Sequence, residues 1–262
     1  MSFRLDHVSF RYPDHQFLTL DALNFSIEPG SFVSVIGPNG SGKSTLLKLL
    51  AGIHPPAMGS IWYHDRSFHT MRPEERATHI AYVPQQHPLL FTMTVTELVA
   101  TGRAPYLNWW GQQTAADLQA MDEAMNLADI HHLKPLPVDQ LSGGEQQRVW
   151  IARALAQQSE TILLDEPTAH LDIRHQIDVY QLLKKLQTHS GRTIVTACHD
   201  LNLAARFSSH ILVLVCGRPF RFGTVADTLT PSVIRDAFQV NTHIESTLAG
   251  IRIDLIPDPA DP

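Results

Sequence analysis

The segment Gly37–Ser44 reads GPNGSGKS and forms a glycine-rich turn between two stretches of different periodicity. The preceding run Ser31–Gly37, SFVSVIG, is short, apolar and β-branched, as expected of a buried strand. From Lys43 onward the leucines recur at helical spacing up to Gly52, and Pro55 and Pro56 follow, so the predicted helix ends there. The order is therefore strand, glycine-rich loop and helix.

This order matches the full pattern G-x-x-x-x-G-K-[ST] of a phosphate-binding loop, which makes a chance glycine-rich turn the weaker alternative. Glycines let successive backbone N–H groups turn inward around a phosphate, and the helix amino terminus adds partial positive charge. We expect Lys43 to reach the γ-phosphate and Ser44 to hold Mg²⁺ through its hydroxyl. The predicted nucleotide contacts here are Gly37, Pro38, Asn39, Gly40, Ser41, Gly42, Lys43, Ser44 and Thr45.

Further apolar runs predict an α/β fold with a mostly parallel sheet. Three of them read as buried strands, at His79–Val83, Thr161–Leu164 and Thr193–Cys198, and helical stretches separate most of them. Alternating strands and helices imply a sheet covered on both faces, with ligands at the carboxyl ends of its strands.

Two other regions depart from this alternation. Helical patterns dominate between about Gln85 and Gln157, which predicts an inserted helical lobe with helices near Thr96–Thr101, Thr114–Ala128 and Glu145–Gln157. Near the amino terminus, period-two alternation in Phe3–Phe10 and at Leu23, Phe25 and Ile27 predicts antiparallel strands at the edge of the core. At the other end, Asp258, Pro259, Asp261 and Pro262 predict a frayed terminus.

Composition narrows the class of protein. The 262 residues allow one large core with an inserted lobe, and the net charge of −6 argues against a broad nucleic-acid surface, which needs clustered cations. Apolar runs such as Ile211–Cys216 are too short to span a bilayer, and no leader pattern opens the chain, so we expect a cytoplasmic protein.

The cysteines and histidines do not suggest a metal site. Cys198 and Cys216 each lie in an apolar run that predicts a buried strand, so reduced thiols packed in the core are favoured over a disulfide. The fifteen histidines, among them His64, His69, His131 and His132, have no zinc-site spacing and are expected to be solvated.

Two adjacent carboxylates follow the strand Thr161–Leu164. Burial at this point would be costly unless cations or water occupy the site. Asp165 fits a Mg²⁺ partner held through water, and Glu166 fits the general base that polarises the attacking water. Taken alone, a strand that ends in an ordinary acidic turn remains an alternative.

The string Leu141–Arg148, LSGGEQQR, resembles the signature sequence of ABC ATPases. Ser142 and Glu145 also form an S-x-x-E capping box, but a cap does not require the glycine pair between them. The resemblance implies that Ser142, Gly143, Gly144 and Glu145 meet the γ-phosphate of the ATP held by a partner subunit. Dimerisation would then be part of the site.

Other elements of the family stand in the expected order. Tyr12 resembles the aromatic that stacks on adenine, Gln85 the glutamine that senses Mg²⁺ and the attacking water, and His199 the switch histidine that contacts the γ-phosphate. Ala169–Asp172 resembles the loop that joins the two sites across the dimer, with His170 as a departure from the usual small residue. Taken alone, Tyr12 could be a core aromatic, Gln85 a polar loop residue and His199 a cap at the end of a strand. Phe17 is an alternative to Tyr12 for the stacking role.

The resemblance covers about Phe3–Phe238 and implies a P-loop NTPase (RecA-like) core. It predicts an ABC ATPase domain over 1–240, with its core at 1–84 and 158–225 and a helical subdomain at about 85–157, and a carboxyl-terminal tail at 241–262. The implied ligands are ATP and Mg²⁺, the latter held by Ser44, Gln85 and Asp165. Catalysis would rest on Lys43, Gln85, Glu166 and His199.

The segments Gly102–Tyr106 and Trp109–Gly111 look like those of ATPases in bacterial importers for iron chelates, haem and vitamin B12, although a surface loop with incidental aromatics remains an alternative. That likeness implies a homodimer on a membrane permease dimer, at the cytoplasmic face of the bacterial inner membrane. A periplasmic or lipoprotein binding protein would deliver the cargo. A soluble ABC ATPase acting on nucleic acid or ribosomes, and an exporter engine, remain the alternatives.

Overall fold

A six-stranded sheet forms the centre of the fold in a computed structural model that describes residues 1–85, 91–169, 171–247 and 250–256. Neighbouring strands follow the order β10-β9-β3-β8-β7-β6. All pairs are parallel except β9 with the edge strand β10, which confirms the predicted mostly parallel sheet. The strands are β3 (Phe32–Ile36), β6 (Ile80–Val83), β7 (Thr161–Asp165), β8 (Thr193–Ala197), β9 (His210–Val215) and β10 (Arg218–Thr224).

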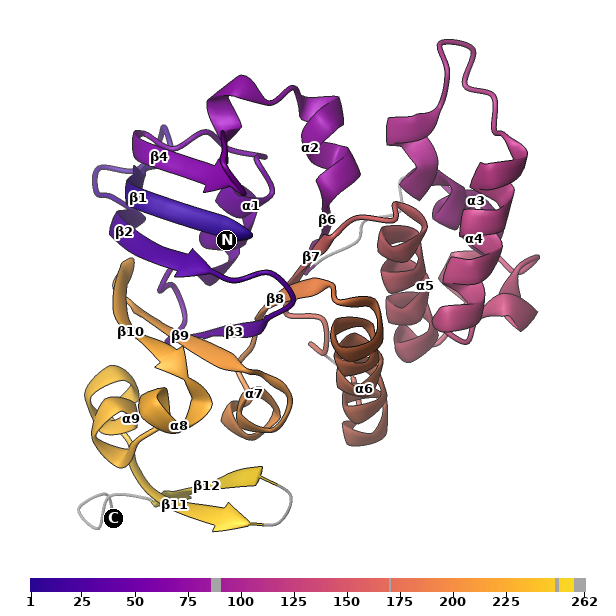
Figure 1. Cartoon of the computed structure of the whole chain (residues 1–262). Coiled ribbons are helices and arrows are strands. Elements are labelled where there is room, and N and C mark those ends of the chain that lie inside the picture. Colours follow the sequence, from indigo (N-terminus) through magenta and orange to yellow (C-terminus); the bar gives the residue numbers. More distant parts are fainter. Residues whose placement is uncertain (86–90, 170, 248–249, 257–262) are drawn as a thin grey trace.

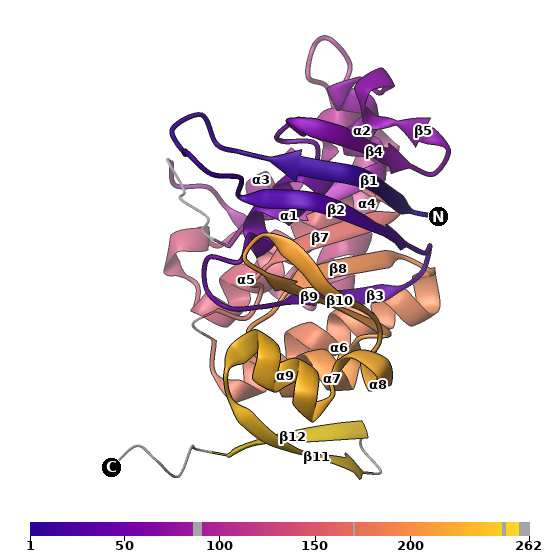
Figure 2. The ribbon, with the colours of Figure 1, turned by 90° about the vertical axis from the view of Figure 1, so that its left-hand side faces the viewer.

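A second, antiparallel sheet covers one side of this core (Figure 1, Figure 2). Its order is β2-β1-β4-β5, and Phe3 of β1 lies opposite both Ile27 of β2 and Tyr63 of β4. The antiparallel strands predicted from the period-two alternation are therefore confirmed. Their bounds are Phe3–Phe10 for β1, Leu20–Ile27 for β2, Met58–Tyr63 for β4 and Arg66–Ser67 for β5.

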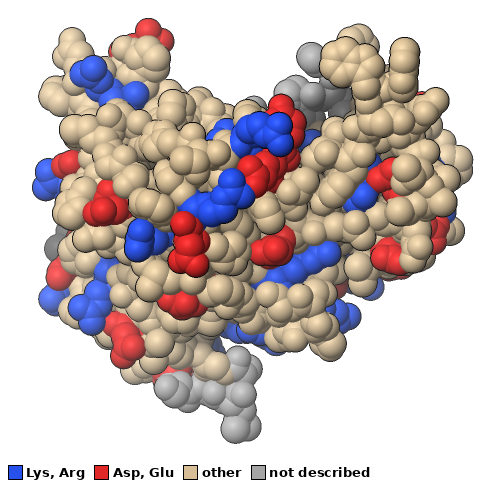
Figure 3. Space-filling model, turned by 45° about the horizontal axis from the view of Figure 1, so that its top comes forward, with Lys and Arg blue, Asp and Glu red and all other residues tan. Residues whose placement is uncertain are grey.

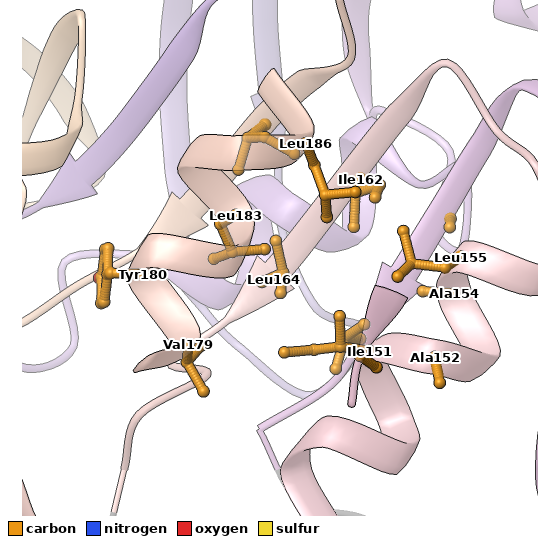
Figure 4. Packing of buried hydrophobic residues seen from close by; sticks show 14 of the residues in the cluster. Ile151, Ala152, Ala154, Leu155, Ile162, Leu164, Val179, Tyr180, Leu183 and Leu186 are labelled. Atoms are coloured by element: carbon orange, nitrogen blue, oxygen red, sulfur yellow. The ribbon is translucent and has the colours of Figure 1, made fainter. Parts of the chain in front are cut away.

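The central strands are buried on both faces, which explains why they read as continuous apolar runs. In β7, Ile162 and Leu164 belong to a core cluster that includes residues of the helices α5 (Gly143–Ala156) and α6 (Ile173–Ser190) (Figure 4). Leu163 belongs to the opposite cluster, with leucines of α1 (Lys43–Leu50). The sheet thus separates two apolar layers.

Helix α1 ends where the sequence predicts. Gly52 adopts a left-handed backbone with φ of +69°, the N–H of Ile53 donates to the carbonyl of Lys48, and the N–H of Gly52 donates to that of Leu49. These two bonds satisfy carbonyls of the last turn that would otherwise lack partners. The conformation costs least for glycine, which lacks a Cβ.

Between β6 and β7 the described residues are mainly helical (Figure 1). Helices α3 (Val95–Ala100), α4 (Ala115–Leu127) and α5 each begin with a capping box, at Thr94, Thr114 and Ser142. The short 3-10 turns are Thr101–Tyr106, His131–Leu133 and Val138–Gln140. The predicted helices of the inserted lobe are present, while the boundaries of the subdomains stay a prediction.

The segment Gly102–Tyr106 is built into this lobe. A Cβ at Gly102 would lie 2.2 Å from the carbonyl oxygen of Arg153, so α5 leaves no room for a side chain there. Arg103 is buried and paired with Asp117 at 2.8 Å, and its guanidinium lies over the ring of Tyr106. Packing within the lobe therefore accounts for Gly102 and Arg103, whereas Trp109 in the next loop is 94% exposed.

The carboxyl-terminal region holds elements that the sequence did not predict. Helices α7 (Leu201–Phe207), α8 (Val225–Thr228) and α9 (Pro231–Phe238) lead into the hairpin of β11 (Asn241–Thr247) and β12 (Gly250–Ile256). The residues predicted to fray, Asp258 to Pro262, lie outside the described ones. Within the described ranges, no helix is long and apolar enough to cross a membrane.

One prediction about the cysteines was wrong. Cys198 is buried and both thiols are free, but Cys216 is exposed. It follows the last residue of β9 and has a left-handed φ of +47°, in the turn that leads to β10. The apolar run therefore extends one residue beyond the buried strand.

Candidate nucleotide site

The loop between β3 and α1 is shaped by close backbone approaches. A Cβ at Gly37 would lie 2.1 Å from the carbonyl oxygen of Leu214, on the neighbouring strand β9. Gly42 has a φ of +100°, and a Cβ there would lie 2.7 Å from a methyl of Leu20. The two glycines let the loop fold tightly at the carboxyl end of β3, which brings its N–H groups to the amino terminus of α1.

Lys43 is held against the same loop. Its Nζ donates to the carbonyls of Gly37 at 2.9 Å and Pro38 at 3.1 Å. Burial lowers the pKa of Lys43, and the carboxylates of Glu166 and Asp165 act in the opposite direction. A cation and a set of backbone N–H groups in one place form an anion site suited to phosphate.

A cavity of about 320 Å³ opens over this loop. Tyr12 lines it, and the Tyr12 hydroxyl is 3.3 Å from Oγ1 of Thr45. The ring of Tyr12 packs edge-on against Phe10, whereas Phe17 is 82% exposed and lines a separate cavity beside Cys216. The residues around the first cavity are Tyr12, His15, Thr19, Asn39, Gly40, Gly42, Lys43, Ser44, Thr45, Glu166 and His199.

Ser44 and Asp165 meet at the edge of this loop. The Ser44 hydroxyl donates to Oδ1 of Asp165 at 2.8 Å, and Tyr82 donates to Oδ2 at 3.3 Å. Burial raises the pKa of Asp165, because the charged form has lost water around it. A hydroxyl and a carboxylate are the hard oxygen ligands that Mg²⁺ prefers, so the donor set fits this ion.

Glu166 is contacted from two further elements. Nε2 of Gln85, after β6, donates to its Oε2 at 2.6 Å, and Nε2 of His199, after β8, contacts its Oε1. Glu166 itself has a left-handed φ of +50°, which is uncommon for a residue with a side chain. The ends of three neighbouring parallel strands thus bring one carboxylate, one amide and one imidazole together beside the loop.

The turn at the start of α5 lies elsewhere. Ser142 accepts from the N–H of Glu145, whose carboxylate accepts in return from Ser142, which lowers the pKa of Glu145. This confirms the predicted capping box. Among the described residues that line the cavity of about 320 Å³, none comes from 142–145, so one chain does not bring this turn to its own loop.

The predicted residues therefore divide into two groups. In the first group, Tyr12, Glu166, His199 and most of the loop residues line one cavity. Asp165 is hydrogen-bonded to Ser44 of this lining and Gln85 to Glu166. The Ser142–Glu145 turn forms the second group, apart from this cavity. Tyr82 was missed as a partner of Asp165, since no local pattern marks it. His170 lies outside the described residues.

This fold and this arrangement define a class, that of nucleotide hydrolases with a P-loop. The ABC transporter family model matches residues 20–169. The Iron(3+)-hydroxamate import ATP-binding protein FhuC of Bacillus subtilis (strain 168) is 39% identical over 225 residues, 86% of this chain and 84% of the relative. Other curated relatives are named for siderophore transport and for cobalamin import.

Solved structures agree with the family match. A structure described as an inward-facing conformation of a metal-chelate type ABC transporter has a TM-score of 0.85 and 30% identity, covering 99% of this chain and 98% of that one. The dimeric ABC cassette MJ0796 bound to ADP and Pi has a TM-score of 0.74 and 31% identity, covering 85% and 98%. The chain belongs to the ABC transporter family and is an ATPase of that type. The resemblance and the fold class predicted from the sequence are confirmed.

Proposed function

We propose that this chain is the ATP-hydrolysing subunit of an importer for an iron chelate (a siderophore or haem) or vitamin B12. The observation that carries the hydrolytic part of the proposal is the contact of Gln85 and His199 with Glu166, directly beside the Gly37–Ser44 loop. The iron-hydroxamate relative and the metal-chelate transporter structure support import of this cargo class.

Each residue has a proposed task in hydrolysis. The loop N–H groups and Lys43 bind the phosphates of ATP, and the ring of Tyr12 stacks on adenine. Glu166 accepts a proton from the attacking water. Its carboxylate is oriented for this task by His199 at Oε1 and by Gln85 at Oε2. His199 contacts the γ-phosphate, and its position in the lining of the cavity supports this role.

Mg²⁺ would be held by the hydroxyl of Ser44, the carboxylate of Asp165 and the amide oxygen of Gln85. When bound, the ion neutralises charge that develops on the phosphates. The hydrogen bond between Ser44 and Asp165 supports this assignment, because it places two of the three donors side by side.

The working unit is a homodimer in which each ATP lies between two chains. Ser142, Gly143, Gly144 and Glu145 of one chain face the γ-phosphate held by the other, where the amino terminus of α5 adds favourable charge. Two observations support this arrangement: the turn lies apart from the chain's own cavity, and the related cassette MJ0796 is a dimer.

The dimer would drive a permease dimer from the cytoplasmic face of the inner membrane, and a periplasmic or lipoprotein binding protein would supply the cargo. A nucleic-acid or ribosome ATPase is disfavoured, since acidic and basic side chains are intermingled on the face shown in Figure 3 and the net charge is −6. The ATPase of an exporter is disfavoured, because the iron-hydroxamate relative is named for import.

The test is uptake into proteoliposomes that contain this chain and a permease with which it assembles. With the binding protein outside and ATP inside, a ferric hydroxamate or cobalamin should accumulate, and Glu166→Gln should abolish the accumulation. ATP-dependent efflux, or ATP hydrolysis that no permease or cargo stimulates, would contradict the import function.

A further inference from the structure

His175, on the first turn of α6, is fixed by Asp172. The backbone N–H of His175 donates to Oδ1 of Asp172 at 2.9 Å, and its ring Nδ1 lies 2.8 Å from the same oxygen. A carboxylate oxygen only accepts, so Nδ1 carries the hydrogen of the second bond. The imidazole is therefore held over the amino terminus of its own helix.

The same ring occupies the place of a side chain at Gly144. A Cβ at Gly144 would lie 2.6 Å from Cδ2 of His175 and 3.2 Å from Nε2. At Gly143, a Cβ would have an ordinary contact of 3.7 Å with a methyl of Leu171. The capping box gives no reason for glycine at position 144, but the ring of His175 does.

We propose that His175 is a positioning residue that makes the Ser142–Glu145 turn and the Leu171–Asp172 segment move as one unit. The ring contacts the first segment and is hydrogen-bonded to the second, so neither shifts without disturbing the ring. This inference rests on the proposed function, in which the Ser142–Glu145 turn faces the nucleotide of the partner chain and Leu171–Asp172 belongs to the loop that joins the two sites across the dimer. His175 then aligns two parts of one surface before that surface closes.

A double-mutant cycle tests the coupling. Alanine is a better helix former than glycine, so within one chain the nearest obstacle to a methyl group at position 144 is the ring of His175. Gly144→Ala should displace the ring, and His175→Ala should remove it. We expect each single variant to lower kcat about 5- to 20-fold, with the KM for ATP within about twofold, and the double variant to be no slower than the slower single variant. Arg174→Ala, an exposed neighbour on the same turn, is the control and should hydrolyse ATP like the wild type.

Each of these variants, combined with Glu166→Gln, should form fewer ATP-dependent dimers than the Glu166→Gln parent at equal protein concentration. Arg174→Ala combined with Glu166→Gln should dimerise as the parent does. If the Glu166→Gln parent dimerises but the losses of kcat in the two single variants add up in the double variant, this inference alone is overturned. A loss of kcat that merely follows a loss of folded protein at the assay temperature would also overturn it. A Glu166→Gln parent that never dimerises would overturn the composite site, and this inference with it.

Discussion

Nε2 of Gln85 donates to Oε2 of Glu166 at 2.6 Å and thereby joins the end of β6 to the end of β7. The bond leaves Oε1 to His199 and orients the carboxylate next to the loop that would hold the phosphates. If Glu166 is the general base, the orientation matters as much as the charge, because proton transfer requires hydrogen-bond geometry to the attacking water.

Replacing Glu166 by glutamine should separate binding from chemistry. Glu166→Gln keeps the size of the side chain but cannot accept a proton, so turnover should fall by about 10²–10⁴-fold while ATP affinity changes little. Steady-state hydrolysis and nucleotide titration check both parts. Glu160→Gln, on an exposed carboxylate just before β7, is the matched control. Near-normal hydrolysis by Glu166→Gln would remove the base assignment.

The stacking role can be assigned by comparing two aromatics. Tyr12 lines the cavity over the loop, whereas Phe17 lines the adjoining one. Tyr12→Ala should therefore weaken ATP binding by about 1–2 kcal/mol, and Phe17→Ala should have a smaller effect. Titration of both variants with a fluorescent ATP analogue measures the difference. A larger loss in Phe17→Ala would transfer the role to Phe17.

Asp165 should control the response to Mg²⁺. Asp165→Asn removes the carboxylate that accepts from Ser44, so the Mg²⁺ concentration that half-activates hydrolysis should rise about tenfold or more. Binding of ATP in the presence of a chelator should stay close to that of the wild type. Unchanged Mg²⁺ activation would show that the ion is held elsewhere.

The buried pair of Arg103 and Asp117 predicts a pH-dependent stability. Hydrogen bonds from Thr114, then the bond from Arg103, lower the pKa of Asp117 to about 2. Since the folded-state pKa lies below the ordinary value of 3.8, the stabilisation is complete above about pH 4 and is lost as the pH falls toward 2. Asp117→Ala should cost about 3–5 kcal/mol at pH 7, because it removes the carboxylate that neutralises the buried Arg103 charge. Urea unfolding at a series of pH values tests this: the difference from wild type should shrink below pH 4, and a constant difference would refute the assignment.

Local patterns predicted much of this molecule. The loop Gly37–Ser44 and the strands β3, β7 and β8 follow from glycine spacing and apolar runs, since each depends on neighbours in the chain. The contact of Tyr82 with Asp165 and that of His175 with Gly144 join residues far apart in sequence, and only the folded chain brings them together. The hairpin β11–β12 was missed although Ile251, Ile253 and Leu255 alternate with Arg252 and Asp254, a period-two pattern that is typical of a strand.

The composite site is the central claim, and ATP-dependent dimerisation tests it most directly. Light scattering on the isolated Glu166→Gln chain, with and without Mg²⁺, should show a dimer with ATP and a monomer when Ser142→Arg is added, because arginine at position 142 blocks the approach of the partner's γ-phosphate. Three results together would contradict the composite site. The Glu166→Gln chain would stay monomeric with ATP, the wild type would hydrolyse ATP at a rate proportional to its own concentration, and Ser142→Arg would leave that rate unchanged.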